Sequence, residues 1–189
     1  MALRLREGDV GVIPTDTIYG IVASALSRPA VARVYRLRRR DPKKPSIILI
    51  ADLTDLILFG IRPTVRQKIV LGRLWPGKFS IVFKVRPGRR YLDRGTGTLA
   101  FRLPDQVALR AFLRVSGPLI APSANWEGYP PAADIRAARR YFGSRVDLYV
   151  DRGVKRGAPS TLVAFRGGRF QVLRAGAGRL PKSLEYGKL

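Results

Sequence analysis

Short apolar segments alternate with amphipathic segments along the whole chain. Runs that are apolar throughout, or apolar at every second position, predict β-strands. They fall at residues 9–14, 17–24, 46–51, 79–85, 98–103, 118–122, 146–150, 161–165 and 169–174. The segment 79–85 is the clearest strand, because Phe79, Ile81 and Phe83 recur at every second position.

Apolar residues at helical spacing predict helices between these strands. Ser27 can cap a helix that carries Pro29 in its first turn and runs to about Arg40. Residues 86–97 are predicted to form a loop. Further helices are predicted at 52–75, with a break near 60–63, at 105–115, and from an Asp134 cap to about Phe142.

Strands that interleave with helices in this way are typical of an α/β domain. We therefore predict a twisted mixed sheet flanked by helices. No linker rich in Pro, Gly or Ser divides the chain, so residues 1–176 are expected to form one domain. Residues 177–189 show no periodicity and are expected to form a C-terminal tail.

The composition excludes several kinds of chemistry. The chain has no cysteine and no histidine. Disulfides, thiolate metal sites and a Ser-His-Asp triad are therefore excluded. Catalysis must depend on carboxylates, hydroxyls, Arg, Lys, backbone amides or a metal ion held by oxygen atoms.

The chain is strongly basic, with 36 Lys and Arg against 13 Asp and Glu, a formal net charge of +23. Such a charge attracts nucleotides, nucleic acids and other polyanions. Adaptation to high temperature is a compatible explanation, since only one Met is present. No apolar run reaches about 18 residues and the N-terminus does not resemble a signal peptide, so we expect a cytoplasmic protein without a membrane partner.

Polar side chains follow the first predicted strand, where α/β sheets commonly bind ligands. They belong to the segment Pro14–Gly20, which contains Thr15, Thr17 and Tyr19 around an acidic residue, Asp16. An ordinary Asx or ST turn is the simpler interpretation of such a loop.

A cluster of six cations lies between residues 36 and 44, at the expected end of a helix. Arg36 and Arg40 are four residues apart and are expected to share a helix face. Guanidinium groups bind carboxylate or phosphate oxygens in bidentate fashion. The helix dipole accounts for one or two of these cations but not for six.

Other candidate residues are scattered along the chain. Ser123 and Asn125 follow an apolar strand and sit beside Pro122. Thr98 and Arg102 are four residues apart on a predicted strand, so both should point to one face. A buried Arg usually has an anionic partner. Ser160 opens a later strand, and Arg174 closes the last one.

These segments occur in an order that resembles the YrdC-type L-threonylcarbamoyladenylate synthases. The resemblance rests on residues 14–20, 35–45, 75–78, 101–104, 121–125, 160–161 and 173–176, and it covers about residues 7–176. It implies an enzyme that joins L-threonine, bicarbonate and ATP, and releases pyrophosphate and L-threonylcarbamoyl-adenylate. It also implies Mg²⁺ accompanying ATP, a concave positively charged cavity in the sheet, and a separate transferase complex that modifies tRNA.

The same resemblance implies roles for individual residues. Arg38 and Arg40 would be catalytic, and no protein residue is expected to bind metal directly. The residues expected to bind threonine are Thr15, Thr17, Tyr19, Arg102 and Ser160. The residues expected to bind ATP are Arg36, Arg40, Thr98, Ser123, Asn125 and Arg174. Asp16 is expected to hold its loop rather than act as a base.

The chain departs from the family pattern at several positions. Arg38 replaces the usual lysine, Asp41 a proline, and Gln106 a histidine. The extra C-terminal domain of longer members is expected to be absent.

Two other functions remain open at this point. The arginine clusters at 36–40, 86–90 and 136–140 could bind double-stranded RNA or tRNA. A carbamoyl-transfer domain like that of hydrogenase maturation proteins is the third possibility.

Overall fold

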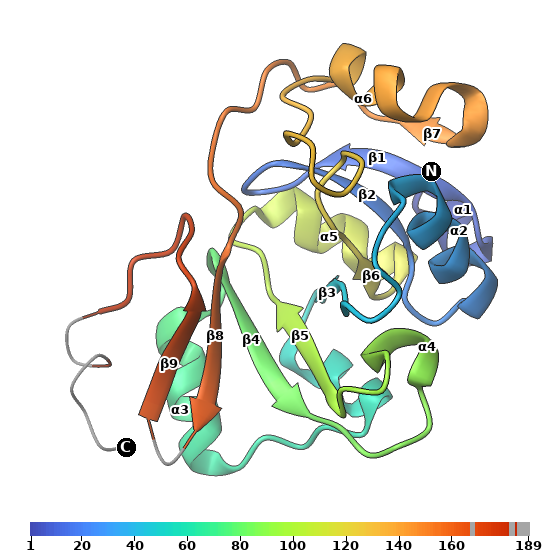
Figure 1. Ribbon diagram of the computed structural model, residues 1–189. Helices are drawn as coiled ribbons and strands as arrows, with labels where there is room; N and C mark the ends of the chain where they lie inside the picture. The colour runs from blue at the N-terminus through green and yellow to red at the C-terminus, as the bar shows by residue number, and fades with distance from the viewer. Residues whose placement is uncertain (167–168, 182–183, 185–189) are drawn as a thin grey trace.

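A nine-stranded twisted sheet organises the molecule (Figure 1). The computed structural model describes residues 1–166, 169–181 and 184. The sheet order is β7-β1-β2-β6-β3-β5-β4-β8-β9. Its strands are β1 (Val10–Pro14), β2 (Tyr19–Ser24), β3 (Ile47–Leu49), β4 (Phe79–Lys84), β5 (Thr98–Arg102), β6 (Leu119–Ile120), β7 (Leu148–Tyr149), β8 (Thr161–Arg166) and β9 (Arg169–Arg174).

Helices connect and flank these strands. They are α1 (Ala2–Glu7), α2 (Arg28–Arg38), α3 (Val65–Leu74), α4 (Arg90–Asp93), α5 (Val107–Ser116), α6 (Ile135–Phe142) and the 3₁₀ helices η1 (Leu53–Phe59) and η2 (Gly143–Arg145). The predicted fold class, a twisted mixed α/β sheet flanked by helices, is confirmed. The pairs β1–β7, β3–β5 and β4–β8 are parallel, and the other neighbouring pairs in the sheet are antiparallel. Within the described residues no helix is long and apolar enough to cross a bilayer.

Local signals placed the helices well, with three differences. Ser27 caps α2, as predicted, but the helix ends at Arg38 because Arg39 adopts a left-handed conformation with φ of 52°. Arg40 therefore lies beyond the helix and does not share a helix face with Arg36. The predicted loop 86–97 contains the short helix α4, which buries Leu92. Helix α1 was not predicted; its one fully buried side chain is Leu5.

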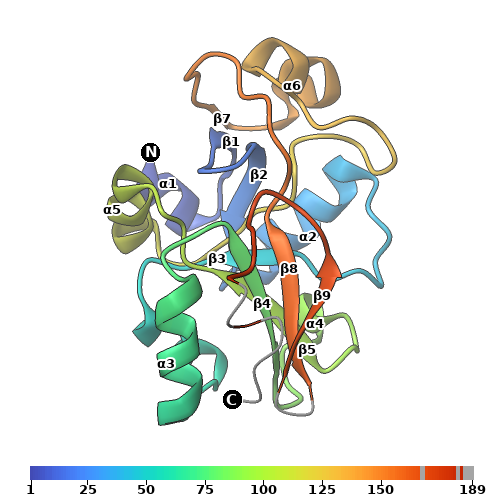
Figure 2. The same cartoon turned by 90° about the vertical axis from the view of Figure 1, so that its left-hand side faces the viewer.

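The two faces of the sheet are covered unequally. Side chains of α1 and α5 pack with Ile13, Val22 and Leu49 in a small core on one face. The larger core lies on the opposite face and takes residues from α2, η1, α3, α4 and α6. Helices α1 and α5 lie side by side (Figure 2), and their core reaches strands β1, β2, β3, β6 and β7. On that face, strands β4, β5 and β8 therefore have no helix over them among the described residues.

Candidate active site

A hollow of about 440 Å³ lies on the part of the sheet that α1 and α5 leave uncovered. Its floor includes Val82 on β4, Ala100 and Arg102 on β5, and Leu162 on β8. These positions alternate with core positions of the same strands, because successive strand residues point to opposite faces. In these strands, every second residue is buried in the core on one face, and the residues between them form the floor of the hollow on the opposite face.

Nine of the twelve predicted site residues line this hollow. They come from segments as far apart as residues 15 and 174, and they are Thr15, Thr17, Tyr19, Arg40, Thr98, Arg102, Ser123, Ser160 and Arg174. The remaining three, Arg36, Arg38 and Asn125, are not among the lining residues. The proximity expected from the sequence is therefore found for most of the set.

The loop after β1 is held by its own hydroxyl groups. Thr15 Oγ1 donates to the Ile18 carbonyl oxygen at 2.7 Å and accepts from the Thr17 amide at 3.2 Å. The Thr15 and Thr17 hydroxyl oxygens are 3.1 Å apart. This is the ST turn considered from the sequence, and it presents Thr17 Oγ1 to the hollow in a fixed position.

Arg102 links this loop to the floor of the hollow. Its Nη1 donates to Thr17 Oγ1 at 2.9 Å, and its Nη2 lies 3.2 Å from Asp16 Oδ1. The side chains of both members of this ion pair are about 95% buried. Burial lowers the pKa of Arg102, and the Asp16 carboxylate opposes that change. The anionic partner expected for a buried strand Arg is thus Asp16.

Two further arginines face the hollow without an acidic partner among the described residues. Arg40 donates to the carbonyl oxygens of Lys44 and Pro45, at 3.1 and 2.9 Å. Arg174 donates from Nη2 to the Ser160 carbonyl oxygen at 2.9 Å. Burial, followed by the charge of Arg40, lowers the pKa of Arg174. An anion bound between Arg40 and Arg174 would stabilise both cations.

The segment 121–125 runs beside the Thr15–Tyr19 loop. Ser123 forms an antiparallel bridge with Gly20, and the amide of Ala124 donates to the Tyr19 carbonyl oxygen at 3.0 Å. Across the hollow, the buried hydroxyl groups of Ser80 and Ser160 lie 2.7 Å apart. Hydroxyl groups thus face the hollow from two of its sides.

Arg38 and Asn125 hold this segment in place through hydrogen bonds and do not line the hollow. Arg38 is 3% exposed, and it donates from Nε to the Asn125 carbonyl oxygen at 3.1 Å and from Nη2 to Ser123 Oγ at 3.2 Å. The Asn125 amide nitrogen donates to the carbonyl oxygens of Trp126 and Tyr129. Burial, with the charge of Arg40 second, lowers the pKa of Arg38 to about 10. Both side chains are used to hold the loop that carries Ser123.

Two other predicted residues are placed differently from what the sequence suggested. Arg36 lines a separate surface hollow with Arg33, Leu37 and Arg145. The Tyr19 hydroxyl donates to the Gly153 carbonyl oxygen at 2.8 Å, so it anchors the 152–153 segment.

Comparison with known proteins gives the family. A family model named Sua5/YciO/YrdC, described as telomere recombination, matches residues 4–176. The chain belongs to the Sua5/YciO/YrdC family. A relative from Mycobacterium tuberculosis is 32% identical over 176 residues, 91% of this chain and 80% of its own length. The threonylcarbamoyl-AMP synthase of Bacillus subtilis is 34% identical over 156 residues, but this chain spans only 45% of it.

A solved structure supports the same assignment. The crystal structure of P. abyssi Sua5 complexed with L-threonine is 30% identical to this chain, with a TM-score of 0.84. The match covers 93% of this chain and 52% of that protein. This member of the Sua5/YciO/YrdC family therefore spans about half the length of some relatives and most of others.

No group of three or more carboxylates that could hold a metal ion occurs among the described residues. One carboxylate, Asp16, lies close to the hollow, and it is paired with Arg102. A Mg²⁺ ion usually binds through substrate phosphates, waters and at most one or two carboxylates. The donor set of this family member therefore fits a metal that arrives with a nucleotide better than a resident metal.

Three other residues at the site have weaker signals in the sequence. Lys44 lines the hollow and belongs to the cation cluster noted above, but no role was assigned to it. The sequence predicts that Asp16 holds its loop, but not its partner Arg102, which is 86 positions away. Ser80 had no signal, because a Ser within an apolar strand is common and its neighbour Ser160 is distant in sequence.

Proposed function

We propose that this protein is an L-threonylcarbamoyladenylate synthase, a nucleotidyltransferase that joins L-threonine, bicarbonate and ATP. The observation that carries the proposal is the hollow in which Arg40, Arg102 and Arg174 meet three hydroxyl-bearing segments. Its volume of about 440 Å³ is within the range of small-molecule sites. Relatives of similar sequence carry the name threonylcarbamoyl-AMP synthase, and one was crystallised with L-threonine.

The proposed reaction suits a chain without histidine or cysteine. The threonine amine attacks the carbon of CO₂ and loses a proton to give a carbamate; when bicarbonate supplies the carbon, a water molecule also leaves. A carbamate oxygen then attacks the α-phosphorus of ATP, and pyrophosphate leaves with the bonding electron pair. Both nucleophiles belong to substrates, so the protein contributes alignment and charge stabilisation. Alignment alone can lower such a barrier by roughly 7–11 kcal/mol.

The threonine end of the hollow is proposed to be the Thr15–Tyr19 loop with Arg102 and Ser160. Thr17 Oγ1 already accepts a hydrogen bond from Arg102, so the pair is oriented before substrate arrives. A guanidinium beside a hydroxyl group matches the carboxylate and hydroxyl of threonine.

The triphosphate is proposed to bind between Arg40 and Arg174, with Thr98 and Ser123 as hydroxyl partners. Burial and then the charge of Arg40 lower the pKa of Arg174, and this supports the assignment because a bound anion would oppose both effects. Arg40 is the proposed catalytic cation, placed to stabilise the leaving pyrophosphate. Mg²⁺ would accompany ATP and offset part of its charge.

Arg38 and Asn125 are proposed to support the site rather than contact the reacting atoms. Arg38 bonds to both ends of the Ser123–Asn125 segment, which explains how an arginine can stand where the family usually has lysine. Arg36 lies outside the hollow and is given no role in the reaction.

The decisive experiment measures pyrophosphate release by the full chain with ATP, Mg²⁺, threonine and bicarbonate. Release should require both threonine and bicarbonate, and mass spectrometry should find threonylcarbamoyl-AMP. Arg40→Ala and Arg174→Ala should each lower kcat/KM by at least about a hundredfold, as loss of a group that stabilises the transition state does. Arg36→Ala is the matched control and should change little. Release that is independent of threonine would refute the proposal.

A separate transferase complex is proposed to consume the adenylate and modify tRNA, and the cytoplasm is the proposed location of the reaction. A carbamoyl-transfer domain is less well supported, because the curated relatives reported above are named as synthases.

Nucleic-acid binding is favoured as a second candidate function by one surface feature. Trp126, Tyr129 and Tyr141 pack edge to face, and the Arg39 guanidinium lies 3.8 Å from the Trp126 ring centroid. Aromatic rings beside arginines stack with bases and attract phosphates. Binding of tRNA or double-stranded RNA that falls steeply with salt, without threonine-dependent pyrophosphate release, would favour this candidate over the synthase.

A further inference from the structure

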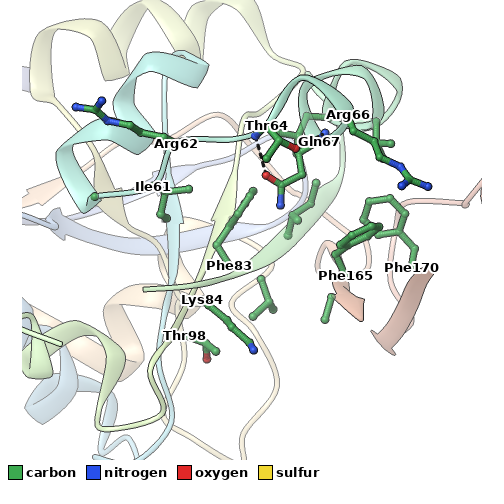
Figure 3. Close-up of a pocket in the computed structure, with 16 residues that line it drawn as sticks. Ile61, Arg62, Thr64, Arg66, Gln67, Phe83, Lys84, Thr98, Phe165 and Phe170 are labelled. Carbon is green, nitrogen blue, oxygen red and sulfur yellow. Dashed lines mark hydrogen bonds between the residues drawn. The ribbon is translucent and has the colours of Figure 1, made fainter. Parts of the chain in front are cut away.

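A second, larger hollow lies on the opposite face of the sheet, under helix α3. Its volume is about 610 Å³, against about 440 Å³ for the candidate active site. We call it the α3 hollow. Figure 3 shows its walls, which come from residues 60–64, α3, β4, β5, β8 and β9. Its described lining residues are Gly60, Ile61, Arg62, Thr64, Arg66, Gln67, Val70, Leu71, Ile81, Val82, Phe83, Lys84, Thr98, Ala164, Phe165 and Phe170.

The sequence of α3 explains why space remains there. The C-terminal half of the helix packs Leu71 and Leu74 into the main core. Its first turn instead turns Arg66 and Gln67 towards the sheet. The Gln67 side chain is used in a capping box, where its Oε1 accepts from the Thr64 amide at 2.9 Å. A side chain held at the helix start does not fill the gap beneath it.

The interior of the α3 hollow is apolar and partly aromatic. Ile61, Val70 and Phe83 are each less than 10% exposed. Phe165 and Phe170 form an edge-to-face pair, with ring centroids 5.5 Å apart, and both remain partly exposed. Aromatic walls of this kind favour binding of a planar apolar group, because the bound group would shield the exposed rings from water.

The rim of the α3 hollow is cationic. Arg62 and Arg66 are exposed, and within the described part of the chain neither makes an ion pair or a side-chain hydrogen bond. Lys84 also borders the hollow, but it is the cross-strand partner of Thr98, so its side chain points to the opposite face of the sheet from Phe83. In Figure 3, Arg66 extends on the side of the Phe165–Phe170 pair, Arg62 lies at the other end of the hollow, and Lys84 and Thr98 point to the other side of the strand from Phe83. No Asp or Glu is found among the described lining residues. Two cations beside one concave apolar surface are complementary to a single anion.

We propose that the α3 hollow is a second binding site, for a small anion with a planar apolar body, such as an aromatic carboxylate or aryl sulfonate. The scarcity of free polar groups inside it disfavours a nucleotide, whose base and ribose need hydrogen-bond partners. The side chain of Thr64 is used by the helix cap and that of Thr98 lies on the opposite face, so among the described lining residues the Gln67 amide nitrogen is the uncharged polar group that remains. Val82 and Thr98 border both hollows, but their side chains lie on the face of the candidate active site, so ligands in the two hollows would lie on opposite faces of the sheet. The proposal does not depend on the proposed reaction.

The test is a fluorescence titration of the full chain with 1-anilinonaphthalene-8-sulfonate, a planar aromatic sulfonate, at fixed salt. One equivalent should bind saturably. The double variant Arg62→Gln/Arg66→Gln should weaken binding by about tenfold, the effect of losing one to two charge-assisted contacts at an exposed rim. The matched control Lys68→Gln/Arg73→Gln removes the same charge from exposed α3 positions that do not line the hollow, and should change the affinity less than twofold.

The other outcomes also decide the matter. Equal weakening in both double variants would show non-specific attraction to a basic protein and overturn the proposal. Displacement of the probe by saturating ATP and threonine would place it in the other hollow and overturn it as well. If the rim variant lost its thermal transition, Phe170→Ala would take its place, and undiminished probe binding by that variant would be decisive against the site. Pyrophosphate release should be unchanged in the rim variant, so failure here leaves the proposed synthase untouched.

Discussion

The buried ion pair between Asp16 and Arg102 allows a quantitative prediction. Asp16→Asn keeps the shape of the side chain but leaves the Arg102 cation without its partner. The two charged atoms are 3.2 Å apart. At that distance, with an effective dielectric constant of about 20, their attraction is about 5 kcal/mol. Breaking a buried pair from one side usually costs about 3–5 kcal/mol, because the remaining charge stays desolvated.

We therefore expect Asp16→Asn to lower the free energy of unfolding by about 3–5 kcal/mol. For a chain of this size each kcal/mol corresponds to about 2–4 °C, so Tm should fall by roughly 6–20 °C. Urea denaturation and calorimetry measure this directly. Arg102→Gln should destabilise similarly, and the double variant should recover part of the loss, since it leaves no unpaired charge.

The refuting results are equally specific. A loss below about 1 kcal/mol for Asp16→Asn, or additive effects in the double-mutant cycle, would show that the pair does not stabilise the fold. In the synthase assay, the variant should raise the KM for threonine, because Arg102 and Thr17 lose their fixed position. Loss of kcat with unchanged threonine affinity would instead indicate that Asp16 acts as a base.

Three further predictions concern the surroundings of the hollow. Arg38→Lys cannot bond to both ends of the Ser123–Asn125 segment and should cost about 1–3 kcal/mol in urea denaturation while raising the KM for ATP. The pKa of Glu127 is lowered by the Asp41 amide and then by Lys44, so its stabilisation is present above its ordinary value of 4.5 and is lost as pH falls through the lowered value. Glu127→Gln should accordingly be less stable by about 0.5–1 kcal/mol at pH 7 in urea melts, with the difference vanishing at strongly acidic pH. Tyr19→Phe should lower Tm by several degrees, through loss of its bond to the 152–153 segment, with little change in the KM for threonine.

The structure decided the arrangement of the site, although the sequence had identified most of its members. Nine of the proposed residues could be named from motifs, because each motif is a short local segment. The direction of Arg38 could not be inferred, since it depends on a loop that is 85 positions away in the sequence and packs behind it. The pairing of Asp16 with Arg102 could not be inferred either, because the two residues are also far apart in the sequence.

Local physical chemistry explains what the sequence determined by itself. Period-two alternation predicted the strands, and the side chains of Ser27 and Asp134 accept hydrogen bonds from backbone amides three residues ahead, as predicted helix caps do. The order of the strands, the helix α4 and both hollows depend on contacts between distant segments. Alternation tells which side chains share a face of a strand, but only the packing of helices decides which part of that face is covered. Helices α1 and α5 cover one part of a face, and the part that they leave open became the candidate active site.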